Sequence, residues 1–368
     1  MRTLRNYLLK EFFGPLVLSL AVLVFVMLLG NLIKITNLIV NKGVNPISVM
    51  KLFGFLIPYL LSYTLPIACL TAVLLSMGRL SGDNEIVAIR SSGISLLHLI
   101  APLLIIGLVF SLVLVVLNDK VIPYAHFASR KTLIEIGIKN PTAVLEPGVF
   151  IDSFERYVIF IYRIDEKENK LYNIRIYEPQ EDNKPTRTII AKRGEFIPDL
   201  EKKIVKFKLI DGTSDEPDPK NPTNFYKVTF KNYFMTLNLA QNGADKKGIE
   251  KKPKDMTIKE LQDKIRKLEI LKVDTTPLIT EMHKKISLAF SCFVFILLGM
   301  PLAIITRRKE KSINFALAFL IVGSYYLLLL GAEALSLQKI IAPYIAIWIP
   351  NILLGFIGIM LNYRLCRH

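Results

Sequence analysis

A short charged stretch, "SGDNEIVAIRSSGIS" at residues 81–95, stands between two long apolar runs. It carries the carboxylates of Asp83 and Glu85 near its start and the guanidinium of Arg90 near its end. Acidic side chains suit the first turn of a helix, because the helix N-terminus bears a partial positive charge. Gly93 is of the residue type that most often ends a helix. We therefore expect a short helix at about residues 81–93.

Two roles are open for this helix. It is either an ordinary solvated loop helix whose acids serve for capping, or a docking surface for another protein. In the second interpretation it presents a carboxylate and a small apolar face to a cytoplasmic motor protein. The residues that we expect to couple this chain to such a motor are Asp83, Glu85, Ile86, Ile89 and Arg90.

Five lysines near the ends of apolar runs are the second group of candidate functional residues. Lysine side chains at such depths often reach ordinary headgroups without any further function. Alternatively, they form a cationic collar for an anionic lipid, with about 1 kcal/mol per lysine near a charged surface. The candidates for binding a lipid headgroup are Lys34, Lys42, Lys51, Lys284 and Lys285.

Other kinds of chemistry have no support in the sequence. It lacks the G-x-x-x-x-G-K-[ST] phosphate loop and the HExxH zinc motif, the four histidines are scattered, and no Ser/His/Asp group stands out. The three cysteines have neither a disulfide pattern nor a metal-binding spacing. Acidic residues are almost absent from the apolar runs, which argues against an ion-coupled carrier. We expect no catalytic residue, no metal and no cofactor in this chain.

The elements that position these residues are membrane spans. Of the 368 residues 52% are hydrophobic, and the mean hydropathy is +0.42. A run of about 20 apolar residues crosses a hydrocarbon core of roughly 30 Å, and in lipid it must be helical to satisfy its backbone polar groups. Six such runs lie at about 13–33, 52–77, 97–118, 285–306, 313–332 and 341–362.

The basic residues of the short loops predict the orientation. With the N-terminus in the cytoplasm, eleven lysines and arginines fall in inner loops and six in outer loops. Both termini and residues 81–95 are then cytoplasmic, and the loop at 119–283 lies outside. That loop holds 30 Lys and Arg against 26 Asp and Glu, whereas the remainder holds 17 against 5. Because the excess charge is juxtamembrane, anionic lipid explains it better than nucleic acid does.

The outer loop has the pattern of a β domain. Alternating stretches such as "YNIRI", "KFKL" and "YKVTF" are separated by turn residues, which predicts a β-sandwich or jelly roll of six to eight strands. Its core is either closed or open along one edge to acyl chains. The predicted layout is spans one to three at 1–118, the β domain at 119–256, an amphipathic connecting helix at 257–283, and spans four to six at 284–368. Thr257 and Glu260 form a capping box for the connecting helix.

An ordered set of segments resembles one family. "LRNYLLKEF" (4–12), "PYLLSYTLPIACLTAVLLSMGRL" (58–80), "MGRLSGDNEIVAIRSSGIS" (77–95), "NPTAVLEPGVF" (140–150) and "GMPLAI" (299–304) are similar to segments of the LptF/LptG lipopolysaccharide-export permeases, also called YjgP/YjgQ. "IPYLLSYTLPIA" and the entry to the β domain look more like LptF, whereas "GNLIKI", which contains Lys34, looks more like LptG. On balance the resemblance is closer to LptF.

The resemblance implies a permease subunit of an ABC transporter of the bacterial inner membrane. Its partners would be a second LptF/LptG-type permease, an LptB-type ATPase dimer that binds ATP and Mg²⁺, and an LptC-type bridge protein. The helix containing Glu85 is similar to the family's coupling helix. Lipopolysaccharide would enter between the two permeases and pass to the periplasmic jelly roll and the bridge. A permease for another anionic lipid or a lipoprotein is an alternative, and an integral lipid-modifying enzyme is a further one.

Overall fold

The structure, a computed structural model, divides into two compact units. Unit 1 comprises residues 1–30, 55–127 and 251–368, and unit 2 comprises residues 31–54 and 128–250. The residues described are 2–36, 39, 44–139, 148–154, 157–165, 170–178, 186–199, 204–217, 225–237, 251–306 and 311–367.

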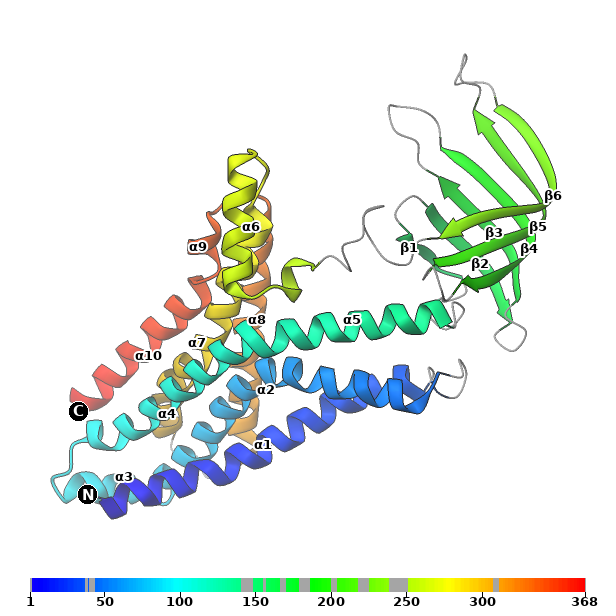
Figure 1. The fold of residues 1–368 in the computed structure, drawn as a ribbon. Helices are drawn as coiled ribbons and strands as arrows, with labels where there is room; N and C mark the ends of the chain where they lie inside the picture. The colour runs from blue at the N-terminus through cyan, green and yellow to red at the C-terminus, as the bar shows by residue number, and fades with distance from the viewer. Residues whose placement is uncertain are drawn as a thin grey trace. The chain divides into compact units, whose positions relative to one another are not determined.

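Six helices of the described chain are long and apolar enough to cross a membrane, which confirms the predicted spans. Their sequences are dominated by Leu, Ile, Val and Phe, and each helix satisfies its own backbone polar groups. The helical elements are α1 Arg2–Thr36, α2 Pro46–Gly82, α3 Glu85–Ser91, α4 Leu96–Val116, η2 Leu117–Val121, α5 Ile122–Lys139, η4 Pro253–Asp255, α6 Ile258–Ile270, α7 Thr276–Thr306, α8 Lys311–Leu337, α9 Pro343–Ala346 and α10 Ile349–Arg367 (Figure 1).

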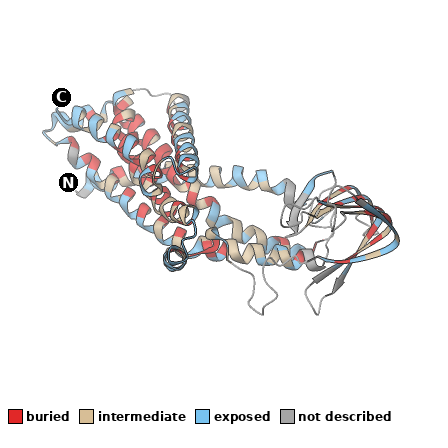
Figure 2. Ribbon diagram, turned by 90° about the horizontal axis from the view of Figure 1, so that it is seen from above, coloured by how far each residue is buried: buried red, intermediate tan, exposed pale blue. Residues whose placement is uncertain are grey.

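Two spans form the centre of unit 1. Most of the apolar stretches of α2 and α7 are buried, whereas little of α1 is, as the colouring by burial shows (Figure 2). Since lipid is as apolar as a leucine side chain, helices in a membrane associate through close packing and hydrogen bonds between them. Asn351 of α10 donates a 2.7 Å hydrogen bond to the carbonyl of Ser287 in α7, and Asn362 donates one of 2.8 Å to the carbonyl of Leu297.

The third span runs further than the sequence predicted. We expected it to end at residue 118, but α4 passes through a one-turn π-helix, η2, into α5, which ends at Lys139. A π-bulge adds a residue to the turn and redirects the side chains that follow. Here it turns Asn118 inward, where its side chain is buried.

The predicted connecting helix is present as α6. Thr257 accepts a hydrogen bond from the Glu260 amide, and the Glu260 carboxylate accepts one from the Thr257 amide. This confirms the capping box. Leu261 and Ile265 of α6 pack against Leu278 at the start of α7. The next span begins at Thr276, earlier than the predicted 284.

The inserted β domain of unit 2 is confirmed, and its described strands form one antiparallel sheet. Six strands pair in chain order, β1-β2-β3-β4-β5-β6, so that each joins its neighbour as in a meander. A jelly roll was expected to distribute strands over two sheets, whereas these strands curl as one sheet (Figure 1). The strands are β1 Phe150–Phe154, β2 Tyr157–Asp165, β3 Lys170–Glu178, β4 Arg187–Asp199, β5 Ile204–Pro217 and β6 Phe225–Leu237.

A crease crosses five of these strands. In the four ladders that join β2 to β6 the register is constant, but each ladder skips one pair of positions, and the skipped positions lie in one row across these strands. At Asn173 and Asp211 the backbone is left-handed, with φ of 53° and 55°, a conformation that Asn and Asp tolerate better than other residues with a Cβ. We call this row the crease; it consists of Tyr162, Asn173, Lys192, Asp211 and Lys231.

The crease lets a single sheet close its own core. In β4, Lys192 and Arg193 are both exposed between the buried residues Ala191 and Gly194, so the inward face changes from odd to even positions. Inward residues from both sides of the crease then form one hydrophobic cluster: Ile159, Ile161, Leu171, Ile174, Ile176, Ile189, Ala191, Phe196, Phe207, Leu209 and Met235.

Gly194 lies at a place where the core of the β domain is tightly packed. A Cβ added there would lie 2.5 Å from Ile174 Cδ1 and 2.8 Å from Phe207 Cε2. We predict that Gly194→Ala destabilises the β domain by about 1–3 kcal/mol, because overpacking forces neighbouring side chains out of their rotamers. Thermal unfolding of the full-length chain, followed by the circular dichroism of the sheet, measures the effect.

Gly54→Ala is the matched control, because no atom lies within 4 Å of the position of its Cβ. If the two variants unfold at the same temperature, the close packing across the crease does not limit stability.

Candidate functional site

The predicted coupling helix is present as α3, which is shorter than expected. It begins at Glu85 and ends at Ser91. Asn84, directly before it, has left-handed backbone with φ of 60°, and this turn separates α3 from α2. Asp83 therefore precedes the helix, and the expectation that it lies in the first turn is wrong. Its carboxylate lies 3.7 Å from Arg79 Nε, one turn back in α2.

Polar contacts join α3 and the end of α2 to the start of α1. Tyr7 of α1 donates a 2.8 Å hydrogen bond from its hydroxyl to Glu85 Oε2. One turn further along α1, Glu11 accepts a 2.5 Å hydrogen bond from Arg79 Nη1. Tyr7 and Glu11 lie four residues apart and so share a face of α1. The Glu85 carboxylate is thereby held in one position on α1.

The two isoleucines of α3 face their own chain. Ile86 is 3% exposed and belongs to the core cluster of unit 1, and Ile89 packs against the same cluster. Val87 and Arg90 are exposed. We expected Ile86 and Ile89 to form a face for a partner, but burial gives Ile86 the role of anchoring the helix. The surface left for a partner consists of the Glu85 edge, Val87 and Arg90.

A buried hydrogen bond ties the same region to the central helix α7. Ser81, in the last turn of α2, donates from its hydroxyl to the carbonyl of Ile304 at 3.0 Å. Its side chain is buried, so the bond is shielded from water. The short helix is therefore connected to α1 through Tyr7, to α2 through the chain, and to α7 through Ser81.

The candidate headgroup lysines fall into two groups. Lys284 and Lys285 lie side by side on α7, where Lys284 forms a 2.6 Å ion pair with Glu333 and Lys285 is buried. Lys51 is exposed on the part of α2 that belongs to unit 2. Lys34 lies on α1, and its side chain is outside the described part of the structure, as is the whole of Lys42.

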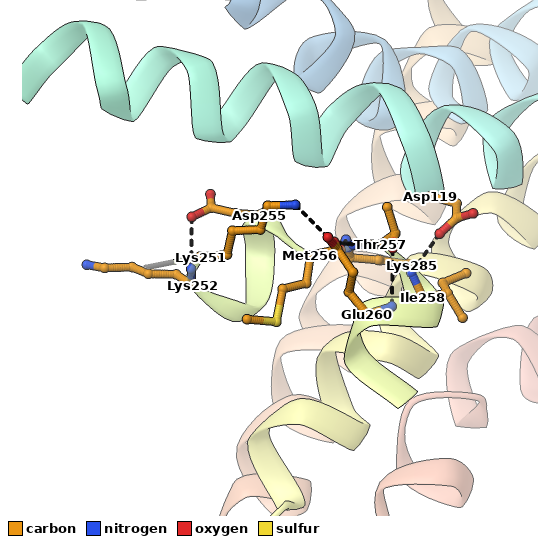
Figure 3. A network of polar contacts seen from close by, with 9 residues as sticks. All are labelled: Asp119, Lys251, Lys252, Asp255, Met256, Thr257, Ile258, Glu260 and Lys285. Atoms are coloured by element: carbon orange, nitrogen blue, oxygen red, sulfur yellow. Dashed lines mark hydrogen bonds and ion pairs between the residues drawn. The ribbon is translucent and has the colours of Figure 1, made fainter. Parts of the chain in front are cut away.

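The buried Lys285 belongs to a polar network around the π-bulge (Figure 3). Its ammonium donates a 2.6 Å hydrogen bond to the carbonyl of Met256. Asn118 donates to the carbonyl of Lys285 at 2.8 Å and accepts a 2.7 Å bond from the hydroxyl of Ser62. Asp119 accepts a 2.6 Å hydrogen bond from the Ile258 amide, in the first turn of α6. We call this set of contacts the clasp.

Burial of Lys285 disfavours its charge, and nearby carboxylates offset part of that cost. These carboxylates are Glu281, Asp119, Asp255 and Glu260. Burial alone would raise the pKa of Glu260, but hydrogen bonds from Lys251 and Thr257 outweigh it and lower that pKa.

The clasp also joins the two chain segments that lead to and from the β domain. His126 of α5 contacts Asp255 through its Nδ1, and Lys251 Nζ lies 5.9 Å from the centre of the Phe127 ring. Phe127 is the last residue of unit 1 before the chain enters the β domain, and Lys251 is the first residue of unit 1 after it. The outgoing and returning segments are thus fastened to each other within unit 1.

Sequence reasoning missed several of these residues. The one sequence feature that could have pointed to Tyr7 and Glu11 is their spacing of four residues, which places them on one helix face. Asn118 and Asp119 are recognisable in the sequence as two polar residues at the end of an apolar run. Their partners lie far away in the chain, and no local pattern identifies them. Among the described residues, no group of three or more His, Cys, Asp or Glu side chains is placed to hold a metal ion.

Comparisons with known proteins agree with this architecture over nearly the whole chain. The family profile described as "Lipopolysaccharide export system permease LptF/LptG" matches residues 6–364. The "Lipopolysaccharide export system permease protein LptF" of Escherichia coli (strain K12) is 20% identical over 97% of this chain and 93% of its own length. An uncharacterized protein of Rickettsia prowazekii is 23% identical over 92% of this chain and 94% of its own length.

The clasp makes a prediction about α6. Asp119→Ala removes the acceptor of the Ile258 amide, and the loss of such a helix cap costs about 1 kcal/mol. We expect amide hydrogen exchange in the first turn of α6 to accelerate about fivefold in the full-length chain. Asp119→Asn retains an acceptor oxygen and should exchange close to the wild-type rate. Equal exchange in all three proteins would show that Asp119 does not hold α6.

Proposed function

Because the chain belongs to the LptF/LptG family of lipopolysaccharide export system permeases, which are non-catalytic membrane subunits of a transporter, we propose that it is one of two permeases driven by a separate ATPase. The other subunit is a second LptF/LptG-type permease. An LptB-type ATPase dimer binds the α3 end of unit 1 and supplies ATP hydrolysis. An LptC-type bridge protein receives lipopolysaccharide on the opposite side of the membrane. Of the two family branches, LptF fits this chain better.

The observation that supports this mechanism best is the fixation of Glu85. A partner that pulls on a flexible loop transmits little force, whereas α3 is joined to three spans through Tyr7, Ser81 and the continuous chain of α2. A displacement of α3 by the ATPase would therefore move α1, α2 and α7 together. Arg90 and Val87, exposed on the same helix, complete the contact surface with Asp83 beside it.

The proposed orientation places α3 and both termini in the cytoplasm and the β domain in the periplasm. Within unit 1 the N-terminus, α3 and the C-terminus lie at one end, and α6 lies at the other (Figure 1). Arg364 and Arg367 occupy the last turn of α10 at the first end. This arrangement agrees with the excess of basic residues that positions short loops on the cytoplasmic side.

We further propose that Lys34, Lys42 and Lys51 contact the phosphates of the lipid at the outer membrane surface. Lys51 is exposed beside the exposed apolar side chains of Ile47 and Met50, a combination that suits a headgroup above acyl chains. Lys284 and Lys285 have protein partners, so they take part only if a phosphate displaces Glu333 or the Met256 carbonyl.

Charge reversal at Glu85 tests the coupling role. We expect Glu85→Lys to lower ATP-dependent transport of lipopolysaccharide by about tenfold or more, because it removes the acceptor of Tyr7 and any charged contact with the partner. Transport in vesicles that contain the complete complex is the measurement, together with the amount of ATPase that co-purifies. Asp263→Lys, which reverses an exposed carboxylate of α6 at the other end of unit 1, is the control. Transport at the wild-type level in Glu85→Lys would reject the proposed coupling role.

A double-mutant cycle tests whether Tyr7 acts through Glu85. Tyr7→Phe keeps the ring and removes the hydroxyl, and we expect it to raise the ATP hydrolysed per lipid transported about threefold. If the hydroxyl works only by holding Glu85, the double variant Tyr7→Phe with Glu85→Ala should have the same effect as Glu85→Ala alone. Additive effects would show that Tyr7 has a separate role, and unchanged coupling in Tyr7→Phe would show that it has none.

A further inference from the structure

The β domain carries a groove on the outward face of its sheet, which the mechanism above does not use. The groove has a volume of about 590 Å³ and is lined by Tyr162, Arg175, Lys192, Asp211, Thr213 and Lys231, among others. Four of these six residues belong to the crease. Its lining also includes Ile190, Ala191, Gly212 and Phe230, of which Ala191 belongs to the core cluster and Phe230 packs against it.

The crease explains why polar groups gather here. The regular pairing of the strands is interrupted at each skipped position. Two successive residues of β4, Lys192 and Arg193, are exposed at the row instead of one. The interruption therefore brings additional polar side chains to the surface in the middle of the sheet.

The charge of the groove is positive. Among the described residues, neither Lys192 nor Lys231 has a carboxylate within ion-pair distance. The Arg175 guanidinium lies 5.7 Å from the centre of the Tyr162 ring, which holds it in place without neutralising it. Asp211, the acidic residue of the lining, forms an ion pair with Arg193, with 3.0 Å between Arg193 Nη2 and Asp211 Oδ2. Three cations therefore remain for an anionic ligand.

The lining also includes groups that can hydrogen-bond to a sugar, beside the apolar residues Ile190, Ala191 and Phe230, against which a sugar ring can pack. Asn173, Thr213 and Thr229 contribute an amide and two hydroxyls. Arginine and lysine bind phosphate well, arginine through two parallel hydrogen bonds. We propose that this groove binds a phosphate-bearing saccharide. A protein strand is a poorer fit, because strand addition needs a free sheet edge and the groove crosses interior strands.

The inference rests on the proposed function in one respect: the saccharide is taken to be the phosphorylated glycan of the exported lipopolysaccharide. The glycan would then be held on the outward face of the sheet. Binding in the groove itself requires neither ATP nor a partner chain, so its test does not depend on coupling through Glu85.

The experiment is calorimetric titration of the purified full-length chain in detergent. The probe is the soluble, phosphorylated oligosaccharide obtained when all acyl chains are removed from lipopolysaccharide. Further titrations use the same oligosaccharide after removal of its phosphates, and inorganic phosphate. We expect the phosphorylated oligosaccharide to bind at least about tenfold more tightly than either of the others, because each good contact to a charged group contributes about a factor of ten.

Variants locate the binding. The double variant Lys192→Gln with Lys231→Gln should bind the oligosaccharide at least about tenfold more weakly. Lys206→Gln changes an exposed lysine of β5 outside the lining, and its affinity for the oligosaccharide should equal that of the wild-type chain. No binding by the wild-type chain, as expected if the groove serves a protein partner, would overturn the proposal. Equal affinity for inorganic phosphate would overturn the saccharide assignment, and an unchanged double variant would overturn the site. Failure of the proposed function would appear instead as unimpaired transport in Glu85→Lys.

Discussion

Apolar helices in lipid gain little by choosing one neighbour over another, so close packing and hydrogen bonds between them decide how they are arranged. In unit 1 such bonds occur along the central helix α7, and two of them lie near the features described above. At one end Ser81 binds the carbonyl of Ile304, and at the other Asn118 binds the carbonyl of Lys285. Each bond uses a polar side chain on a neighbouring span and a carbonyl of α7. Ser81 lies shortly before α3, and Asn118 belongs to the clasp, so these two bonds help to position both features.

The two ends suit the two tasks of an export permease. At the α3 end the Glu85 carboxylate accepts a hydrogen bond from Tyr7 of α1, and the coupling role that we propose rests on this contact. At the α6 end the segments that lead to and from the β domain are fastened to each other through Asp255 and Asp119. Movement of the spans at that end would therefore reach both segments together.

The β domain solves a different problem, since six strands in chain order form a single sheet and a single sheet has only one inner face to bury. The crease changes which residues point inward halfway along the strands, so that residues on both sides meet in one core. Gly194 leaves room for the close approach of Ile174 and Phe207. The same device concentrates polar and basic residues on the outer face, which is why the core and the outward groove are consequences of one feature.

The sequence by itself determined the features that depend on neighbours in the chain. Apolar run lengths predicted the six spans, alternation predicted the β domain, and Thr257 with Glu260 predicted the start of α6, because each is a local property of the backbone and its burial. Tertiary structure alone decided that Tyr7 meets Glu85, that Asp119 caps α6, and that Ile86 faces inward. It also decided the row formed by the crease, because its five positions come from five strands. Such contacts join atoms far apart in the chain, and residue type and spacing carry no record of which distant polar atoms will meet.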